Sequence, residues 1–357
     1  MKWVLFLAIL LIMEIIAAIV VCKKLKQGRV RRIIRLFVAI VMIILIIVTA
    51  KFVLFPPVKE LATTGEHQIT SKDYWVTLDK EDPLSKSGRK RQVQVRKWYP
   101  VDGENKELPV IVASHGSCGT IDNNVTLYRE LASYGYTVLA LAHPGHAASA
   151  ILEDGTKVGV SGEYMKEMGK SQPQSEVEDA ARLFQKWMEI RMDDMNGVMD
   201  DYRRREGDVK FVALGHSAGG SAAYAMGRVR GDVVACIALE SPCMYDIKGA
   251  KDGDFVFDET DYEVPLLNIY SDSSYSHLRE WKQYKNNAKF LDSDKDLYTN
   301  IHYEGTGHLG LCDLSVASPL LTAIMDGGFA KVDAKTQLKT INKDCVKFLN
   351  EVVGNNQ

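Results

Sequence analysis

Short, nearly continuous apolar runs alternate with amphipathic stretches from about residue 76 to the C-terminus. Strands buried on both faces of a sheet produce such runs, and helices between them make the strands parallel. The pattern predicts an α/β fold: a mostly parallel sheet with helices on both faces. In such a sheet, ligands bind beyond the carboxyl ends of the strands. The expected strands lie within 91–100, 108–116, 136–145, 209–217, 232–242, 264–272 and 297–305, and the expected helices span 124–135, 175–205, 218–229, 276–288 and 336–353.

Two apolar segments precede this region, at about residues 3–22 and 33–55. A membrane-spanning helix needs roughly 20 apolar residues. The first segment contains Glu14, and an acid at the centre of a helix opposes insertion by about 2.5–3.5 kcal/mol. About a dozen Leu, Ile, Val and Phe residues in the same segment favour insertion by roughly 4–7 kcal/mol. We therefore expect a two-helix transmembrane hairpin over residues 1–55, with Glu14 facing the second helix.

The loop between the two segments, residues 23–32, is dense in Lys and Arg. Short basic loops stay in the cytoplasm, so both outer ends of the hairpin are expected outside it. A cleaved signal peptide is the alternative, but no small-residue cleavage site follows either segment. The sequence predicts a cell-membrane protein with two spanning helices, a polar linker at 56–75 and an extracytoplasmic domain at 76–357.

The sequence "GHSAG" at residues 215–219 follows an apolar run and opens a helix of small residues. This strand–turn–helix context is the one that the G-x-S-x-G nucleophile motif requires. The flanking glycines suit a turn too tight for side chains. Ser217 at the start of the helix then lies where backbone N–H groups favour a developing negative charge. We interpret Ser217 as a nucleophile.

A serine nucleophile needs a base, and the chain has eight histidines. His308 lies in the Gly-rich loop "EGTGH" after the last expected strand, and it follows Ser217 in chain order, as the fold requires of the base. His216 is in the turn itself, and His143 and His146 are expected to line the pocket. The H-x-x-H spacing of that pair has no companion ligands, so we expect neither a metal nor a cofactor.

Two acids follow strands between the nucleophile and the base, and either can orient the imidazole. Glu240 follows the run after the nucleophile's helix, and Asp272 follows the next run. Chain order alone leaves both open. The oxyanion needs backbone donors, for which we expect the N–H groups of Ala218 and of Ser117 in the loop "SHGSCGT".

Several spaced motifs carry a resemblance to the platelet-activating-factor acetylhydrolase family of the α/β-hydrolases, over roughly residues 90–352. The stretch "SHGSCGT" is similar to that family's oxyanion turn, "GHSAGG" to its elbow, and "HLGLCDL" to its H-x-x-F-x-D-F signature, with Leu311 and Leu314 replacing the aromatic residues. The family's acid follows the strand after the nucleophile helix, so the resemblance implies Glu240. Glutamate in place of aspartate, and Ala218 in place of a common phenylalanine, depart from the family pattern.

The resemblance implies a serine hydrolase that cleaves short-acyl or lipid-like carboxylic esters through an acyl-enzyme. A peptidase, an acyltransferase and a non-catalytic anchored binding protein are the alternatives. The formal net charge of −2 gives no reason to expect nucleic acid as a partner. Residues 149–175 are expected to form a flap over the pocket, with an ordinary surface insertion as the alternative. Of the six cysteines, Cys118, Cys243 and Cys312 lie near site elements, where free thiols are favoured over one disulfide.

Overall fold

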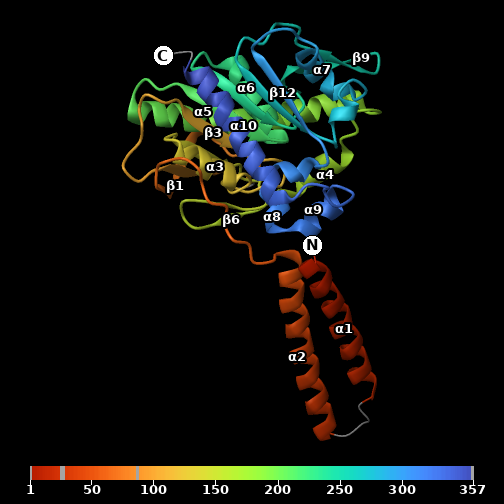
Figure 1. Ribbon diagram of the computed structural model, residues 1–357. Helices are drawn as coiled ribbons and strands as arrows, with labels where there is room; N and C mark the ends of the chain where they lie inside the picture. Colours follow the sequence, from red (N-terminus) through yellow and green to blue (C-terminus); the bar gives the residue numbers. More distant parts are fainter. Residues whose placement is uncertain (1, 25–28, 86–87, 355–357) are drawn as a thin grey trace. The chain divides into compact units, whose positions relative to one another are not determined.

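The computed structural model describes residues 2–24, 29–85 and 88–354. The chain divides into two units (Figure 1). One unit comprises Met1–Glu60 and Leu314–Ala330, and the other comprises Leu61–Asp313 and Lys331–Gln357. The segment Leu314–Ala330 therefore groups with the N-terminal helices, although the sequence analysis included it in the single domain 76–357.

The second unit is built on a sheet whose described residues form eight strands in the order β1-β2-β4-β3-β7-β8-β11-β12. All neighbours from β4 to β12 run parallel, whereas β1 and β2 are antiparallel additions at one edge. This arrangement confirms the expected α/β fold with a mostly parallel sheet. The strands are β1 (Ile69–Glu81), β2 (Lys90–Pro100), β3 (Val110–Ser114), β4 (Val138–Ala142), β7 (Phe211–His216), β8 (Val233–Leu239), β11 (Leu266–Ser271) and β12 (Tyr298–Tyr303).

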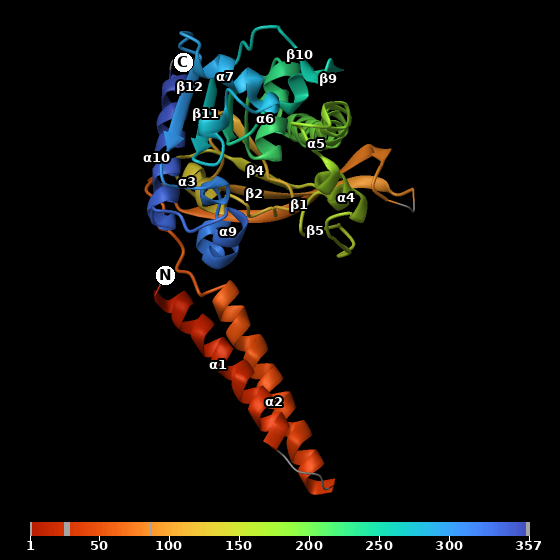
Figure 2. The ribbon, with the colours of Figure 1, turned by 90° about the vertical axis from the view of Figure 1, so that its right-hand side faces the viewer.

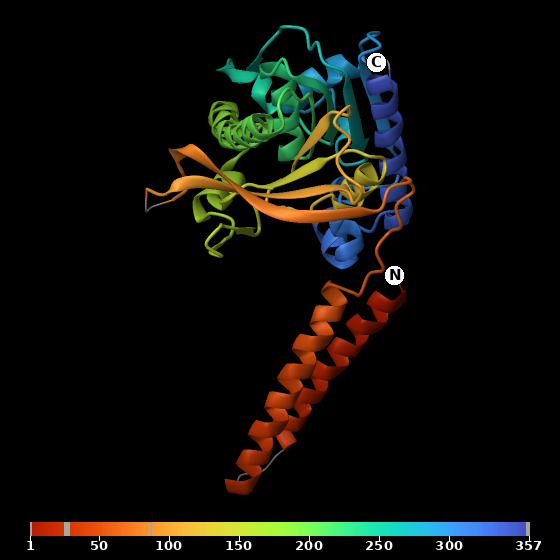
Figure 3. The same ribbon diagram turned by 90° about the vertical axis from the view of Figure 1, so that its left-hand side faces the viewer.

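The sequence pattern did not predict the first strand: β1 begins at Ile69, inside the predicted linker 56–75. Most of its side chains are exposed or half-buried, as is usual for the edge of a sheet. The strand therefore lacks the apolar run that marks the central strands. It pairs along its length with β2 to form the long hairpin drawn in orange in Figure 3.

Helices cover both faces of the sheet, as Figure 2 shows. On one face lie α3 (Val125–Ser133) and α10 (Ala334–Gly354), which contact each other. On the other face, α5 (Val177–Glu206) and α6 (Ala218–Val229) pack together and against the central strands. The apolar core lies between these helices and the sheet and includes Trp187, Met195 and Phe211. The expected amphipathic pattern thus places each apolar helix face on the sheet.

The remaining elements of this unit are short. The predicted single helix over 276–288 is wrong: two 3-10 turns precede a short helix there. The predicted flap contains a two-stranded ribbon and a helix. The elements are β5 (Ala150–Ile151), β6 (Lys157–Val158), α4 (Gly162–Lys170), β9 (Ile247–Lys251), β10 (Asp254–Phe257), α7 (Lys285–Leu291) and the 3-10 turns Met244–Asp246, Tyr275–His277, Lys282–Tyr284 and His308–Leu311.

The first unit contains α1 (Lys2–Lys24), α2 (Arg29–Leu54), α8 (Leu314–Ala317) and α9 (Pro319–Met325). Within the described residues, one stretch, Leu36–Leu54, is long and apolar enough to cross a membrane, with a mean hydropathy of 3.0. In α1 the apolar stretch Leu7–Val20 is shorter, so the predicted second crossing is not confirmed. Parts of the predicted loop 23–32 are helical, and its residues 25–28 lie outside the described residues.

Glu14 faces α2, as expected. The hydroxyl of Thr49 on α2 donates a hydrogen bond of 3.1 Å to Oε1 of Glu14. The Oε2 atom is buried, and no described residue donates a hydrogen bond to it. A carboxyl group in an apolar helix is tolerated when a neighbouring helix supplies a donor, so this contact joins α1 and α2 at their polar positions.

Candidate active site

Ser217 lies in a strained turn between β7 and α6. Its backbone has φ 54° and ψ −128°, which a residue with a side chain rarely adopts. The turn requires glycine on both sides, because a Cβ atom on Gly215 would lie 2.2 Å from the carbonyl oxygen of Gly219. A Cβ atom on Gly219 would lie 2.0 Å from the carbonyl oxygen of Ser114. The serine remains partly exposed at the carboxyl end of the sheet, where a substrate can reach it.

His308 opens a 3-10 turn after β12 and is held through its backbone. Its N–H donates to Oγ of Ser273 at 3.0 Å, and its carbonyl oxygen accepts a 3.0 Å hydrogen bond from Nε2 of His216. The two imidazole rings also pack together, with centroids 4.6 Å apart. His216 therefore fixes the loop that carries His308, a role that the sequence pattern did not predict.

Glu240 lies directly after β8, and its carboxylate Oε2 is 3.4 Å from Nδ1 of His308. The hydroxyl of Ser271 donates to the same oxygen atom. Burial raises the pKa of Glu240, but hydrogen bonding and charge attraction from His308, with help from Ser271, outweigh it and leave the pKa below its usual value. The side chain is 1% exposed, so it is a buried carboxylate beside the imidazole.

Asp272, the alternative acid, faces elsewhere. Its Oδ1 is 2.9 Å from Nε2 of His302, and its Oδ2 accepts a 2.8 Å hydrogen bond from the N–H of Gly305. Both partners lie on β12 or in the turn after it. The structure thus brings Glu240, and not Asp272, to the imidazole of His308.

The loop after β3 lies against the nucleophile. A Cβ atom on Gly116, the residue before Ser117, would lie 3.3 Å from Cβ of Ser217. Ala218 opens α6, where backbone N–H groups have no partner within the helix. The two backbone donors expected from the sequence therefore belong to segments that flank Ser217.

A helix of the predicted flap closes over this loop. The hydroxyl of Tyr164, on α4, is 2.6 Å from Oγ of Ser117. The Tyr164 ring also stacks on His146, with ring centroids 3.8 Å apart. Tyr164 is 1% exposed although it lies on a surface element. No sequence motif marks this residue, and only the expectation of a flap over 149–175 indicated that side chains from this region reach the site.

His143 is a structural residue and does not line the pocket, contrary to the expectation. Its Nδ1 donates to the carboxylate of Asp194 at 2.9 Å, and its Nε2 is 2.8 Å from Oγ of Ser114. Burial lowers the pKa of His143 to about 4, so the ring is neutral near pH 7. Among the described residues, no group of three or more His, Cys, Asp or Glu side chains is arranged to hold a metal ion.

The five cysteines whose side chains are described are free thiols: Cys118, Cys236, Cys243, Cys312 and Cys345. Cys118 is half-buried, and its Sγ lies 3.7 Å from Sδ of Met165 on α4. The side chain of Cys22 lies outside the described residues. The structure therefore pairs none of the three site-proximal cysteines with another.

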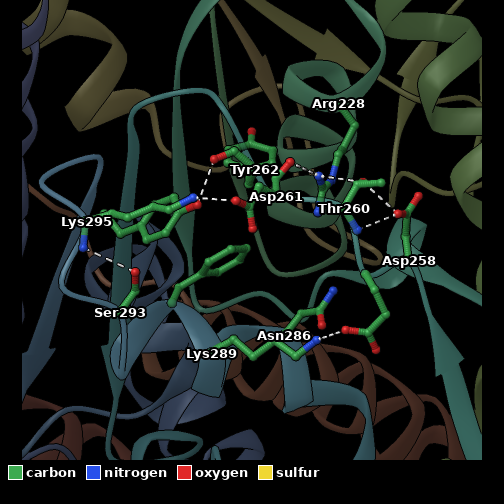
Figure 4. Close-up of a pocket in the computed structure, with 12 residues that line it drawn as sticks. Arg228, Asp258, Thr260, Asp261, Tyr262, Asn286, Lys289, Ser293 and Lys295 are labelled. Atoms are coloured by element: carbon green, nitrogen blue, oxygen red, sulfur yellow. Dashed lines mark hydrogen bonds and ion pairs between the residues drawn. The ribbon is translucent and has the colours of Figure 1, made fainter.

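A separate pocket of about 110 Å³ lies near the amino ends of β11 and β12, whereas Ser217 follows the carboxyl end of β7. Figure 4 shows the side chains that line this pocket. Several of its charged side chains are already engaged with neighbouring groups. Nζ of Lys295 is 2.7 Å from Asp261, and Arg228 donates to the carbonyl oxygen of Asp261 at 2.6 Å. Lys289 pairs with Glu259 in the same way. This pocket contains no nucleophile aligned with a base.

The strand order, the strained serine turn and the position of His308 after the last strand define an α/β-hydrolase fold with the layout of a serine hydrolase. Residues 105–257 match the sequence profile of a hydrolase family described as serine aminopeptidase, S33. None of the curated protein sequences matches the chain. The profile match supports a serine hydrolase, and it does not distinguish the platelet-activating-factor acetylhydrolase family from its relatives.

Solved structures agree on the fold. The chain is similar to a ferulic acid esterase from Streptomyces cinnamoneus, with a TM-score of 0.57, 17% identity, and coverage of 82% of this chain and 92% of the esterase. A dienelactone hydrolase-like promiscuous phosphotriesterase from metagenomic libraries gives a TM-score of 0.50 at 12% identity, with coverage of 80% of this chain and 98% of that protein. At such low identity these likenesses describe the fold and leave the substrate open.

Proposed function

We propose that this chain is a serine hydrolase that cleaves carboxylic esters by way of an acyl-enzyme. His308 accepts the proton of Ser217 as the hydroxyl attacks the ester carbonyl carbon. The N–H groups of Ser117 and Ala218 bind the oxyanion, and the carboxylate of Glu240 stabilises the imidazolium. His308 then returns the proton to the departing alcohol, and water releases the acyl group by the same steps. The observation that carries the proposal is the buried Glu240 carboxylate beside His308, next to a strained serine turn.

We further propose that the enzyme is anchored in the cell membrane with its catalytic unit outside the cytoplasm. The apolar stretch Leu36–Leu54 and the basic loop 23–32 support this topology. In the same unit, Oγ of Ser318 donates to the carbonyl oxygen of Leu54, which ties α9 to the end of α2. Exposed apolar residues near this junction suit contact with lipid: Phe55, Ile324, Met325 and Phe329.

The substrate class follows from location and resemblance. A hydrolase held at a bilayer meets esters that partition into lipid, and the resemblance stated above implies short or modified acyl groups. We therefore propose a lipid-like ester with a short acyl chain as the substrate. The peptidase alternative has support from the description of the matched family, so amide substrates belong in the same test.

The test uses the full-length protein in detergent, with p-nitrophenyl esters from acetyl to long acyl chains and with aminoacyl p-nitroanilides. Ser217→Ala is the control. We expect ester hydrolysis that peaks at short chains and falls by about 10³-fold or more without Ser217. Preference for the anilides would establish the peptidase. Transfer of the acyl group to an added alcohol, in place of hydrolysis, would establish the acyltransferase. Ester hydrolysis that persists in Ser217→Ala would overturn the assigned nucleophile.

A further inference from the structure

One peptide group next to Ser217 is held unusually firmly: the group that joins Gly116 to Ser117. Its carbonyl oxygen, on Gly116, has three donors around it. Nδ1 of His115 lies at 2.6 Å, the N–H of Gly119 at 3.1 Å and Nη2 of Arg191 at 3.4 Å. The guanidinium of Arg191 also donates from Nη1 to the carbonyl oxygen of His115 at 2.6 Å. Two successive carbonyl groups therefore face one cation on α5.

The orientation of the carbonyl groups fixes the orientation of the donor. A trans peptide holds its C=O and N–H bonds in nearly opposite directions, and the described chain contains no cis peptide. Because the Gly116 carbonyl faces Arg191, the N–H of Ser117 points away from it. This N–H is the oxyanion donor assigned above. Hydrogen bonds to the oxygen of a peptide also polarise its N–H, which makes it a stronger donor.

His115 is locked in one tautomer by its two contacts. Its Nε2 accepts a 3.1 Å hydrogen bond from the N–H of His143, so its Nδ1 carries the proton that binds Gly116. The ring stays neutral because burial, together with the nearby His143 and the positive charge of Arg191, keeps the pKa of His115 well below its usual value. The imidazole is therefore a fixed donor to the oxyanion peptide and is not available as a base.

Arg191 differs from the other buried arginine of this region. Arg91 makes two hydrogen bonds of 2.6 Å to Asp194 and a third, of 2.8 Å, to Asp82. Arg191 is 0% exposed, and its described partners are carbonyl and hydroxyl oxygens, without a carboxylate. Its Nε has no partner in the described residues. Burying a cation without a counter-ion is unfavourable, so the carbonyl oxygens of His115 and Gly116 carry most of the stabilisation of this charge.

We propose that Arg191 is a positioning residue for the oxyanion hole, in which its guanidinium orients the Gly116–Ser117 peptide and polarises the N–H of Ser117 that faces the developing oxyanion. The inference rests on the proposed function, because the peptide matters only if Ser217 attacks a carbonyl group. Arg191 is expected to stabilise the transition state, in which the oxyanion exists, and not to change the binding of a neutral ester.

The test compares four full-length variants in detergent: Arg191→Met, Arg191→Lys, Arg228→Met and Ser217→Ala. We expect Arg191→Met to lower kcat for p-nitrophenyl acetate by about 10²–10³-fold, as for the loss of one oxyanion donor, with KM within about threefold. Affinity for an alkyl boronic acid, which forms a tetrahedral anion on serine, is expected to fall in parallel. Arg191→Lys keeps the positive charge and one hydrogen-bond donor. Its kcat is therefore expected to be at least tenfold higher than that of Arg191→Met.

Arg228→Met is the matched control, because Arg228 is also a helical arginine with a largely buried side chain, and it hydrogen-bonds to Asp246 and to the carbonyl oxygen of Asp261. We expect it to lower the melting temperature and leave kcat unchanged. Equal losses of kcat in both methionine variants, or boronate affinity unchanged in Arg191→Met, would reduce Arg191 to a packing residue. If Arg191→Met does not fold, Arg191→Lys with a lowered melting temperature but unchanged kcat and boronate affinity leads to the same conclusion. Activity that survives in Ser217→Ala refutes the proposed function itself.

Discussion

Replacing Glu240 by glutamine separates the two acids that chain order left open. The Oε2 atom of Glu240 accepts the Ser271 hydroxyl and lies 3.4 Å from Nδ1 of His308, while Oε1 is buried without a described partner. If the glutamine oxygen takes the Oε2 position, its amino group is buried without an acceptor. If the amide is reversed, its N–H groups face the hydroxyl of Ser271 and Nδ1 of His308, which are themselves donors. In both arrangements the imidazolium loses its counter-charge.

The expected loss follows from this geometry. Removing the charge of a triad acid while keeping its size lowers kcat by about 10⁴-fold in serine proteases. We expect a fall in kcat/KM of about 10³–10⁴-fold for Glu240→Gln, which corresponds to roughly 4–5.5 kcal/mol of transition-state stabilisation. Asp272→Asn changes only contacts to His302 and Gly305, so we expect a loss below about tenfold, or less than roughly 1.4 kcal/mol.

Initial rates with p-nitrophenyl acetate, measured on full-length protein beside thermal unfolding, provide the comparison. The unfolding measurement separates a catalytic loss from a loss of folded protein. The reasoning is refuted if Glu240→Gln retains more than about a tenth of the activity while Asp272→Asn loses about 10³-fold, because the triad acid would then be Asp272.

Three further expectations follow from the same structure. Gly219→Ala places a Cβ atom 2.0 Å from a backbone oxygen of Ser114, so we expect about 3 kcal/mol or more of destabilisation in denaturant unfolding, whereas Gly169→Ala, with no atom within 4 Å, should be neutral or stabilising. Burial lowers the pKa of His216 to about 3, so the unfolded chain binds the extra proton first as pH falls below about 6.5. His216 alone is therefore expected to account for about 2 kcal/mol of the stability lost between pH 7 and pH 5, in addition to the losses from the buried His115, His143 and His146. A His216→Gln variant that shows the same slope as the unmodified chain would contradict this. If the catalytic unit lies outside the cytoplasm, an alkaline phosphatase fused after Gln357 is expected to be active, and a green fluorescent protein fused there is expected to be dark. The reverse pattern would place the catalytic unit in the cytoplasm.

Most of the fold could be predicted from the sequence because its determinants are local. The central strands are continuous apolar runs, and Figure 2 shows the expected helices on both faces of the sheet they form. The edge strand β1 was missed, since an edge strand needs no apolar run. The stretch 276–288 was assigned one helix because its pattern is amphipathic, yet it breaks into short turns before α7. These errors lie at the margins of the sheet, where side-chain burial constrains the chain least.

The nucleophile turn and the base were indicated by sequence alone, because a G-x-S-x-G turn and chain order are local or sequential features. Their catalytic roles stay predictions until the serine and histidine are tested. For the acid, chain order left Glu240 and Asp272 open, the family resemblance implied Glu240, and the tertiary structure places Glu240 beside His308. Glu240 reaches His308 because β8 and β11 pair so that the N–H of Glu240 bonds the carbonyl of Ile269 at 2.6 Å, and no local pattern encodes that register.

The residues that hold the catalytic side chains and the oxyanion loop in place could be identified only from the tertiary structure. Tyr164 reaches Ser117 from a surface helix, and His216 holds the carbonyl of His308 across the sheet edge. Arg191 lies mid-helix among other charged residues, with nothing in its neighbours to mark it. The sequence by itself thus determined the layers, the turn and the order of the reacting groups. Only the packed structure decided which side chains from distant elements surround them, because those contacts depend on burial and distance, which periodicity does not carry.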